Sequence, residues 1–294
     1  MDSRLIRAAR VPMVLSLTGA LASCGGGAYV VPPDGNDVSK SQKLSCSQAC
    51  IASDSVSIDK LRQSYVLVND GQDARAYAAF GTGVDPRANV EVSGTDQVRV
   101  VTPQGTQKFY VLQPNNLGTA IANAFITALT GPLPYGSDLS QAQAAQAVQF
   151  QFVRGSTVYT STVTAPASFS ISAPTSNAAL AISTRALEVR LTSATPATIS
   201  VQATNCTDTN GNTATSSAQA LSVTPSTSVP GSYAVDLGAY LDGLSFSTTY
   251  PRGLLSQCNL TLMAFMQADG QPAPGFASTV VLAQQLRRVS VTLR

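Results

Sequence analysis

The sequence contains no histidine and no tryptophan, and only 12% of its 294 residues are charged. Histidine is the commonest general base and a common metal ligand, while the tryptophan ring is the best aromatic platform for stacking. Their absence argues against histidine-dependent catalysis, against histidine metal centres and against tryptophan-based sugar platforms. We therefore expect a protein that is not an enzyme and that needs no cofactor and no metal.

Runs of lysine or arginine are also missing. Three of the 18 basic residues and one of the 16 acidic residues precede Cys24, so the chain from Cys24 onward carries 15 of each and is neutral. Proteins that bind nucleic acid need a basic surface that neutralises phosphates. We therefore expect no nucleic-acid partner.

The first 24 residues have the features of an export signal. Three arginines lie within the first ten residues, and an apolar stretch follows at 11–20, which is too short for a transmembrane helix but suits a signal peptide. The next residues, Leu21, Ala22, Ser23 and Cys24, resemble the lipobox of bacterial lipoproteins. An ordinary secretory signal followed by an incidental cysteine is the other interpretation.

The lipobox resemblance implies that residues 1–23 are a signal peptide and that Cys24 carries the lipid, palmitate among its acyl chains. Two or more acyl chains hold a protein stably on a membrane. The residue after Cys24 is Gly25 rather than aspartate, which favours the outer membrane over the inner one. Residues 24–43 are rich in glycine and proline and predict a flexible tether.

Four cysteines remain beyond Cys24, and an even number in an oxidising compartment predicts disulfides. Three pairings exist. Local spacing favours Cys46–Cys50, and the position of both cysteines in the second half of the chain favours Cys206–Cys258. The second pair would close a loop that stabilises the fold by about 4 kcal/mol. A redox pair at Cys46 and Cys50 fits less well, because three residues rather than two separate them, and the spacing of the distant pair does not suit zinc.

The body of the chain alternates apolar and polar residues in short runs broken by Gly, Pro, Asn and Asp, which predicts strands. The hairpin at residues 148–163, with Gly155 and Ser156 in its turn, is the clearest example. We expect an all-β protein of two immunoglobulin-like sandwiches, at 44–165 and 166–294, with a short helical insertion at 116–129. Further strands are expected at 64–68, 75–80, 89–92, 97–101, 108–112, 187–191, 199–203, 218–223, 232–237, 259–266 and 289–293.

The expected strand with Leu187, Val189 and Leu191 on one face is typical of a sandwich core. This half weakly resembles uncharacterised proteobacterial lipoproteins with immunoglobulin-like domains. That resemblance implies no activity.

Two groups of residues are candidates for a calcium site or a catalytic site. Asp208, Asn210 and Asn212 alternate like the start of a calcium loop, but Thr213 stands where glycine is needed and no carboxylate closes the loop, so a hairpin tip is expected. The glutamates Glu91 and Glu188 fall in different halves, and no Gly-x-Ser-x-Gly elbow is present.

The sequence therefore favours a non-catalytic binding or structural role at the cell envelope. The expected partners are the membrane, reached through the lipid, and an envelope protein or glycan. A carbohydrate- or peptidoglycan-binding module is an alternative if exposed tyrosines form a row on one sheet face, and a surface hydrolase is an alternative if aspartates, or a buried Ser with a Lys or Asp, meet in a cleft. The tyrosines are Tyr29, Tyr65, Tyr77, Tyr110, Tyr135, Tyr159, Tyr233, Tyr240 and Tyr250.

Overall fold

A computed structural model describes residues 50–82, 90–112, 134–216, 219–221, 223–247, 251 and 253–294. This part of the chain is mostly β, with several sheets packed together, so the predicted all-β sandwich architecture is confirmed. Its immunoglobulin-like character stays a prediction. The leader, Cys24, the tether, Cys46 and the insertion at 116–129 lie outside the described residues.

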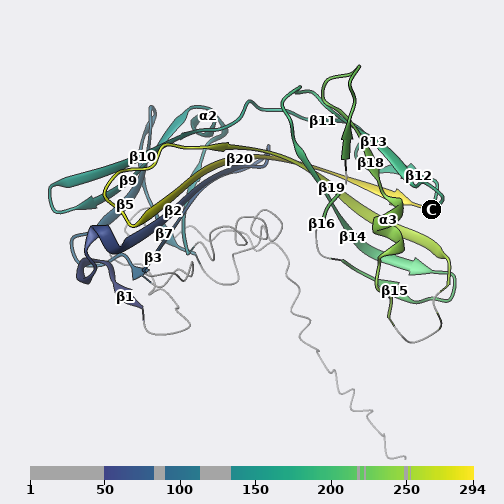
Figure 1. Ribbon diagram of the computed structural model, residues 1–294, viewed down its shortest axis with the longest axis horizontal. Helices are drawn as coiled ribbons and strands as arrows, with labels where there is room; N and C mark the ends of the chain where they lie inside the picture. Colours follow the sequence, from purple (N-terminus) through teal and green to yellow (C-terminus); the bar gives the residue numbers. More distant parts are fainter. Residues whose placement is uncertain are drawn as a thin grey trace, which may run out of the picture.

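One large sheet, which we name the floor sheet, runs through the molecule (Figure 1). Its main order is β15-β14-β19-β20-β2-β3-β8-β7, with β12 paired to β20 and β16 paired to β14. The ten strands are β2 (Leu61–Asn69), β3 (Ala74–Thr82), β7 (Tyr110–Val111), β8 (Tyr135–Leu139), β12 (Ala178–Leu180), β14 (Thr198–Asp208), β15 (Thr213–Ala214), β16 (Gln219–Ala220), β19 (Leu255–Asp269) and β20 (Ser278–Leu293).

Two four-stranded sheets pack on this floor, one near each end in Figure 1. The first has the order β10-β9-β5-β6 and the second the order β11-β13-β18-β17. Their strands are β5 (Gln97–Thr102), β6 (Gly105–Lys108), β9 (Ala147–Arg154), β10 (Thr157–Thr164), β11 (Ile171–Ala173), β13 (Ala186–Leu191), β17 (Val223–Pro225) and β18 (Ser232–Asp236). The shorter elements are β1 (Ile51–Ala52), η2 (Ser53–Ser55), η3 (Ile58–Lys60), β4 (Val90–Glu91), α2 (Gln141–Ala144) and α3 (Gly238–Asp242).

The first sandwich is filled by aromatic side chains from both of its sheets. Tyr65 of β2 stacks on Phe150 of β9 with ring centroids 4.8 Å apart, and Phe80 of β3 lies 5.5 Å from Phe152. Large buried rings bring much apolar area and a preferred offset geometry. They therefore fix how the small sheet sits on the floor.

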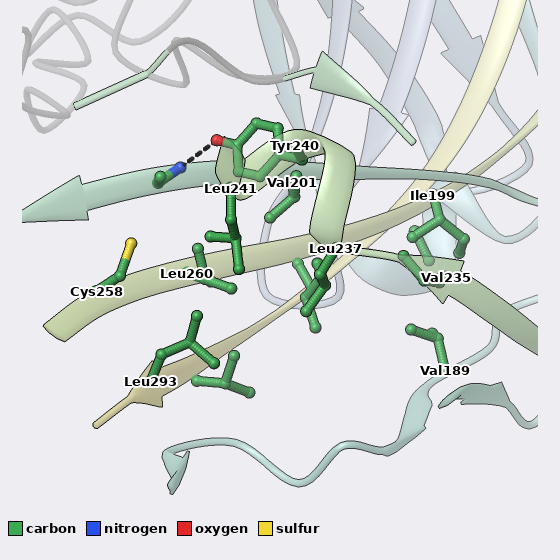
Figure 2. Packing of buried hydrophobic residues seen from close by; sticks show 14 of the residues in the cluster. Val189, Ile199, Val201, Val235, Leu237, Tyr240, Leu241, Cys258, Leu260 and Leu293 are labelled. Carbon is green, nitrogen blue, oxygen red and sulfur yellow. Dashed lines mark hydrogen bonds between the residues drawn. The ribbon is translucent and has the colours of Figure 1, made fainter. Parts of the chain in front are cut away.

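The second sandwich has an aliphatic core (Figure 2). Val189 and Val235 come from the small sheet, and Ile199, Val201 and Leu260 from the floor. All five are essentially inaccessible to solvent. Deleting any of these side chains would leave a cavity, so this end of the molecule depends on close packing.

Strand β20 takes part in both sandwiches. Its first half pairs in parallel with β2, from Ser278 opposite Arg62 to Gln285 opposite Asn69, and its last residues pair with β12. Val281 lies in the first core and Val291 in the second. The proposed division at residue 165 stays a prediction, but β20, which lies within the expected second domain 166–294, also contributes Val281 to the first core.

Arg287 lies on β20 between Val281 of the first core and Val291 of the second, and its side chain is on the same face of the strand. Its guanidinium donates to the carbonyl oxygens of Phe169 at 2.7 Å and Asn69 at 3.2 Å, and to Ser168 Oγ at 3.0 Å. It also lies 5.3 Å from the centroid of the Phe169 ring. One side chain thus ties the connection between the sandwiches to the β2–β3 turn and to β20.

Most of the expected strands are present, and two differ. The partner of β5 is β6, whereas Tyr110 and Val111 belong to the floor sheet as β7. The single strand expected at 218–223 is divided between β16 and β17, which lie in different sheets. Both differences arise because the chain changes sheets at these points, which a local alternation of side chains does not reveal.

Candidate functional site

A shallow pocket lies at the junction of the two halves, on the face of the floor sheet opposite both sandwich cores. It is lined by Val68, Asp70, Asp73, Arg75, Tyr77, Leu286 and Arg288. The apolar base of the pocket consists of Val68, Tyr77 and Leu286. These residues belong to a hydrophobic cluster on this face that also includes Val66 and Leu282. We name this the junction pocket.

The β2–β3 turn places the acidic side chains of the pocket. Asp70 Oδ1 accepts hydrogen bonds from the backbone amides of Gln72 at 3.0 Å and Asp73 at 2.8 Å, and Gly71 takes a positive φ of 92°. An aspartate that accepts from amides two and three residues ahead favours this tight turn. The turn therefore holds the Asp70 carboxylate still at the pocket rim.

Ion pairs neutralise several charges around the pocket. Arg288 donates to Asp70 Oδ2 at 3.1 Å, and Arg75 Nε donates to Asp138 Oδ1 at 2.8 Å. Tyr110 donates its hydroxyl to the other oxygen of Asp138 at 2.9 Å. Carboxylates held in this way have fixed positions, from which they can orient groups on a ligand or partner.

The arrangement suits recognition. An apolar floor with arginine and aspartate groups at its rim can fit a side chain or short segment that carries both an apolar part and a charge. The sequence predicted two of the strands that carry pocket residues, at 64–68 and 75–80. It missed the pocket because Arg288 reaches Asp70 across 218 positions of the chain.

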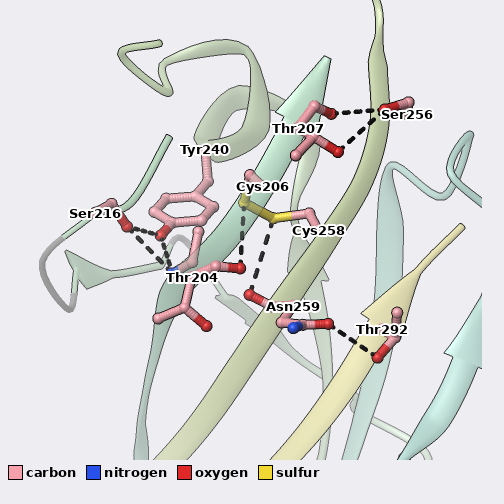
Figure 3. The surroundings of a disulfide bond; sticks show 10 residues. Thr204, Cys206, Thr207, Ser216, Tyr240, Ser256, Cys258, Asn259 and Thr292 are labelled. Atoms are coloured by element: carbon pink, nitrogen blue, oxygen red, sulfur yellow. Dashed lines mark hydrogen bonds between the residues drawn. A yellow bond between two sulfur atoms is a disulfide. The ribbon is translucent and has the colours of Figure 1, made fainter. Parts of the chain in front are cut away.

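The predicted pair Cys206–Cys258 is a disulfide in the structure, which confirms this pairing (Figure 3). The two cysteines are fully buried on β14 and β19, and 52 positions separate them. Cys50 is disulfide-bonded as well, while Cys46 lies outside the described residues. Next to the Cys206–Cys258 bond, Tyr240 of α3 accepts from the Ala203 amide at 2.8 Å and hydrogen-bonds with Ser216.

The candidate calcium residues form a hairpin tip. Asp208 accepts from the backbone amides of Asn210 at 2.9 Å and Gly253 at 2.7 Å, and from the side chain of Asn212 at 2.8 Å. Burial raises the pKa of Asp208, but these hydrogen bonds outweigh it and lower the pKa to about 2. The carboxylate is occupied by the loop itself, as expected for a structural turn.

The tyrosines of the described segments do not form an exposed row. Tyr65, Tyr77, Tyr135, Tyr233 and Tyr240 are buried, and Tyr110 and Tyr159 are half-buried. Burial raises the pKa of Tyr135 to about 12. The condition set for the glycan-binding alternative is thus not met among these residues.

The two glutamates lie in different parts of the structure. Glu91 lies on β4 beside the first sandwich, and Glu188 on β13 pairs with Arg190 at 2.8 Å. Among the residues that the structure describes, no three Cys, Asp or Glu side chains are grouped to hold a metal ion. In the same residues, no helix has both the length and the apolar character required to cross a membrane.

No protein-family model matches the chain, and no curated protein matches it in sequence.

Proposed function

We propose that this chain is an exported bacterial lipoprotein, attached to a membrane through lipid on Cys24, with a non-catalytic binding or structural role at the cell envelope. The observation that carries the export part is the buried disulfide between Cys206 and Cys258. Disulfides persist in oxidising compartments outside the cytoplasm, which is where a lipobox would deliver the chain. Gly25 after the cysteine favours the outer membrane.

The binding role is supported by the junction pocket. It lies beside a junction held by Arg287 and by the shared strand β20, so its walls belong to a rigid part of the sheet. Rigid walls lower the entropy cost of binding. We propose an envelope protein as the ligand of this pocket, because an apolar centre surrounded by charged groups is the usual arrangement of a protein interface.

The anchor is tested by the substitution Cys24→Ser. We expect the variant to fold like the wild type but to move from the membrane fraction to the soluble fraction, since the acyl chains would be lost. Incorporation of labelled palmitate should disappear with it. A variant that stays in the membrane fraction and still carries label would contradict the anchor.

The binding role is tested by a pull-down with the full Cys24→Ser chain on solubilised outer-membrane proteins and, in parallel, on purified cell-wall glycan. We expect saturable capture of protein that Asp73→Lys weakens, because a reversed charge at the pocket rim disturbs the electrostatic complementarity with the partner. Asp59→Lys, on η3, is the matched control. Retention on glycan alone would replace the proposal with the carbohydrate-binding alternative.

A further inference from the structure

Strand β10 is an outer strand of the first small sheet. It pairs with β9 through eight consecutive residues without a bulge, from Thr157 opposite Arg154 to Thr164 opposite Ala147. On its other side, among the residues that the structure describes, only Thr162 is paired, with Gln271. The other outward-directed backbone groups of β10 point away from β9.

The Gln271 contact shows which backbone groups point outward. The Thr162 amide donates to the Gln271 carbonyl at 2.9 Å, and the Gln271 amide donates to the Thr162 carbonyl at 2.7 Å. Because the direction of these groups alternates along a strand, the amides and carbonyls of Val158 and Thr160 point to the same side. Neither residue has a backbone partner there within the described part of the chain.

The chain after Gln271 turns into the sandwich and does not continue along this edge. The amide of Ala273 donates to Ser161 Oγ at 2.9 Å, and Phe276 packs on the inward-facing ring of Tyr159 with centroids 5.0 Å apart. The free edge is therefore residues 157–161. The β9–β10 turn bounds it at one end and Gln271 at the other.

The sequence of β10 itself lacks the features that usually protect an edge strand. None of the eight residues of β10 is charged or a proline, and four of them are threonine. Val158 is 45% exposed. Natural edge strands are normally shielded by lysine, proline, bulges or a covering loop, so a regular, uncharged edge is a template for another strand.

We propose that residues 157–161 pair antiparallel with the same residues of a second copy of this chain. A two-fold axis at Tyr159 places Val158 opposite Thr160 of the second copy, and the two positions exchange all four outward backbone hydrogen bonds. In this register Thr157 of the second copy lies opposite Ser161, and the β9–β10 turn of the second copy begins next to Gln271, which pairs with Thr162. This match in length is what selects a second copy over an unrelated strand.

The pairing joins two four-stranded sheets into one sheet of eight strands. It places Val158 directly opposite Thr160 of the second copy, and both are β-branched residues that suit the pleated surface of a strand. It does not depend on lipid attachment or on the junction pocket. Its failure would leave the proposed function standing, and the reverse also holds.

Analytical ultracentrifugation of the full chain with Cys24→Ser, over a range of concentrations, tests the proposal. We expect reversible dimers, and we expect Thr160→Pro to raise the dissociation constant about tenfold or more, because proline removes one outward amide and adds bulk at the edge. The matched control is Thr106→Pro on β6, whose amide points outward at the opposite edge of the same sheet. The control should dimerise like the parent, and both variants should keep its circular dichroism spectrum.

A cross-linking experiment fixes the register. The double variant Val158→Cys and Thr160→Cys should form covalent dimers on mild oxidation, since directly opposed residues lie within disulfide reach. Val158→Cys with Thr164→Cys should not. A parent that stays monomeric at all concentrations, a Thr160→Pro dimer as tight as the parent, or equal cross-linking of both cysteine variants would overturn the proposal.

Discussion

At the scale of single residues, the buried charge of Asp96 is the most costly group to disturb. Its carboxylate is inaccessible to solvent and accepts from Arg154 Nε at 2.9 Å and from Ser53 Oγ at 2.8 Å. Arg154 also donates to the carbonyls of Ser53 and Val56, both at 2.7 Å. These bonds fasten the segment before β2 to the first small sheet.

Replacing Arg154 with alanine should destabilise the protein by about 3 to 5 kcal/mol, because it leaves the Asp96 carboxylate buried without its cation. Urea unfolding followed by circular dichroism measures the loss. Arg190→Ala is the control, since its pair with Glu188 is solvent-exposed, and its unfolding midpoint should match the wild type. Equal midpoints for all three proteins would contradict the assignment.

Asp208 predicts a dependence of stability on pH. Its pKa is about 2 in the folded protein against an ordinary 3.8, so its contribution is present above pH 3.8 and is lost as the pH falls toward 2. We expect the urea midpoint of the wild type to fall more steeply over this range than that of Asp208→Asn, which binds no proton there. Parallel curves would show that the hairpin does not hold the ionised form.

At the scale of elements, the Cys206–Cys258 bond links β14 to β19 at one end of the floor sheet. The double variant Cys206→Ala and Cys258→Ala should lose about 4 kcal/mol, since the unfolded chain regains the entropy of an open loop. Reversible denaturant unfolding gives the value. The double variant isolates this bond, because a reducing agent would also cleave the disulfide of Cys50. An unchanged midpoint would show that the bond does not stabilise the fold.

The sequence predicts local elements of this fold well. The β9–β10 hairpin follows from alternating Val, Phe and Gln around a Gly155 turn. The full length of β20 could not be predicted, because buried Gln284 and Gln285 and the junction residue Arg287 interrupt its apolar alternation. Its parallel pairing with β2 connects distant positions and leaves no local pattern.

Some features of the candidate site could be predicted from the sequence, and others could not. The disulfide was predictable from cysteine number and spacing, and the Asp208 hairpin from missing calcium ligands. The junction pocket was not, since its walls come from β2, β3 and β20 and meet only through tertiary pairing.

At the scale of the whole molecule, Arg287 should decide how rigidly the two sandwiches are held. Arg287→Met removes the hydrogen bonds of this side chain to Phe169, Ser168 and Asn69. We therefore expect a broader distribution of interatomic distances in small-angle X-ray scattering and a lower melting temperature. The neighbouring Arg288→Met is the control, because Arg288 makes one ion pair at the surface. Identical scattering and melting for Arg287→Met and wild type would contradict a locking role.

The place of β20 also has a consequence for how the chain folds. The first core needs Val281 and Ala283, which lie near the end of a chain whose first described core residue is Leu61. Such long-range contacts make folding slow, and open intermediates expose unpaired strands. A chain that emerges amino-terminus first can therefore begin its first sandwich at Leu61 but can close it only after Val281 and Ala283 have also emerged.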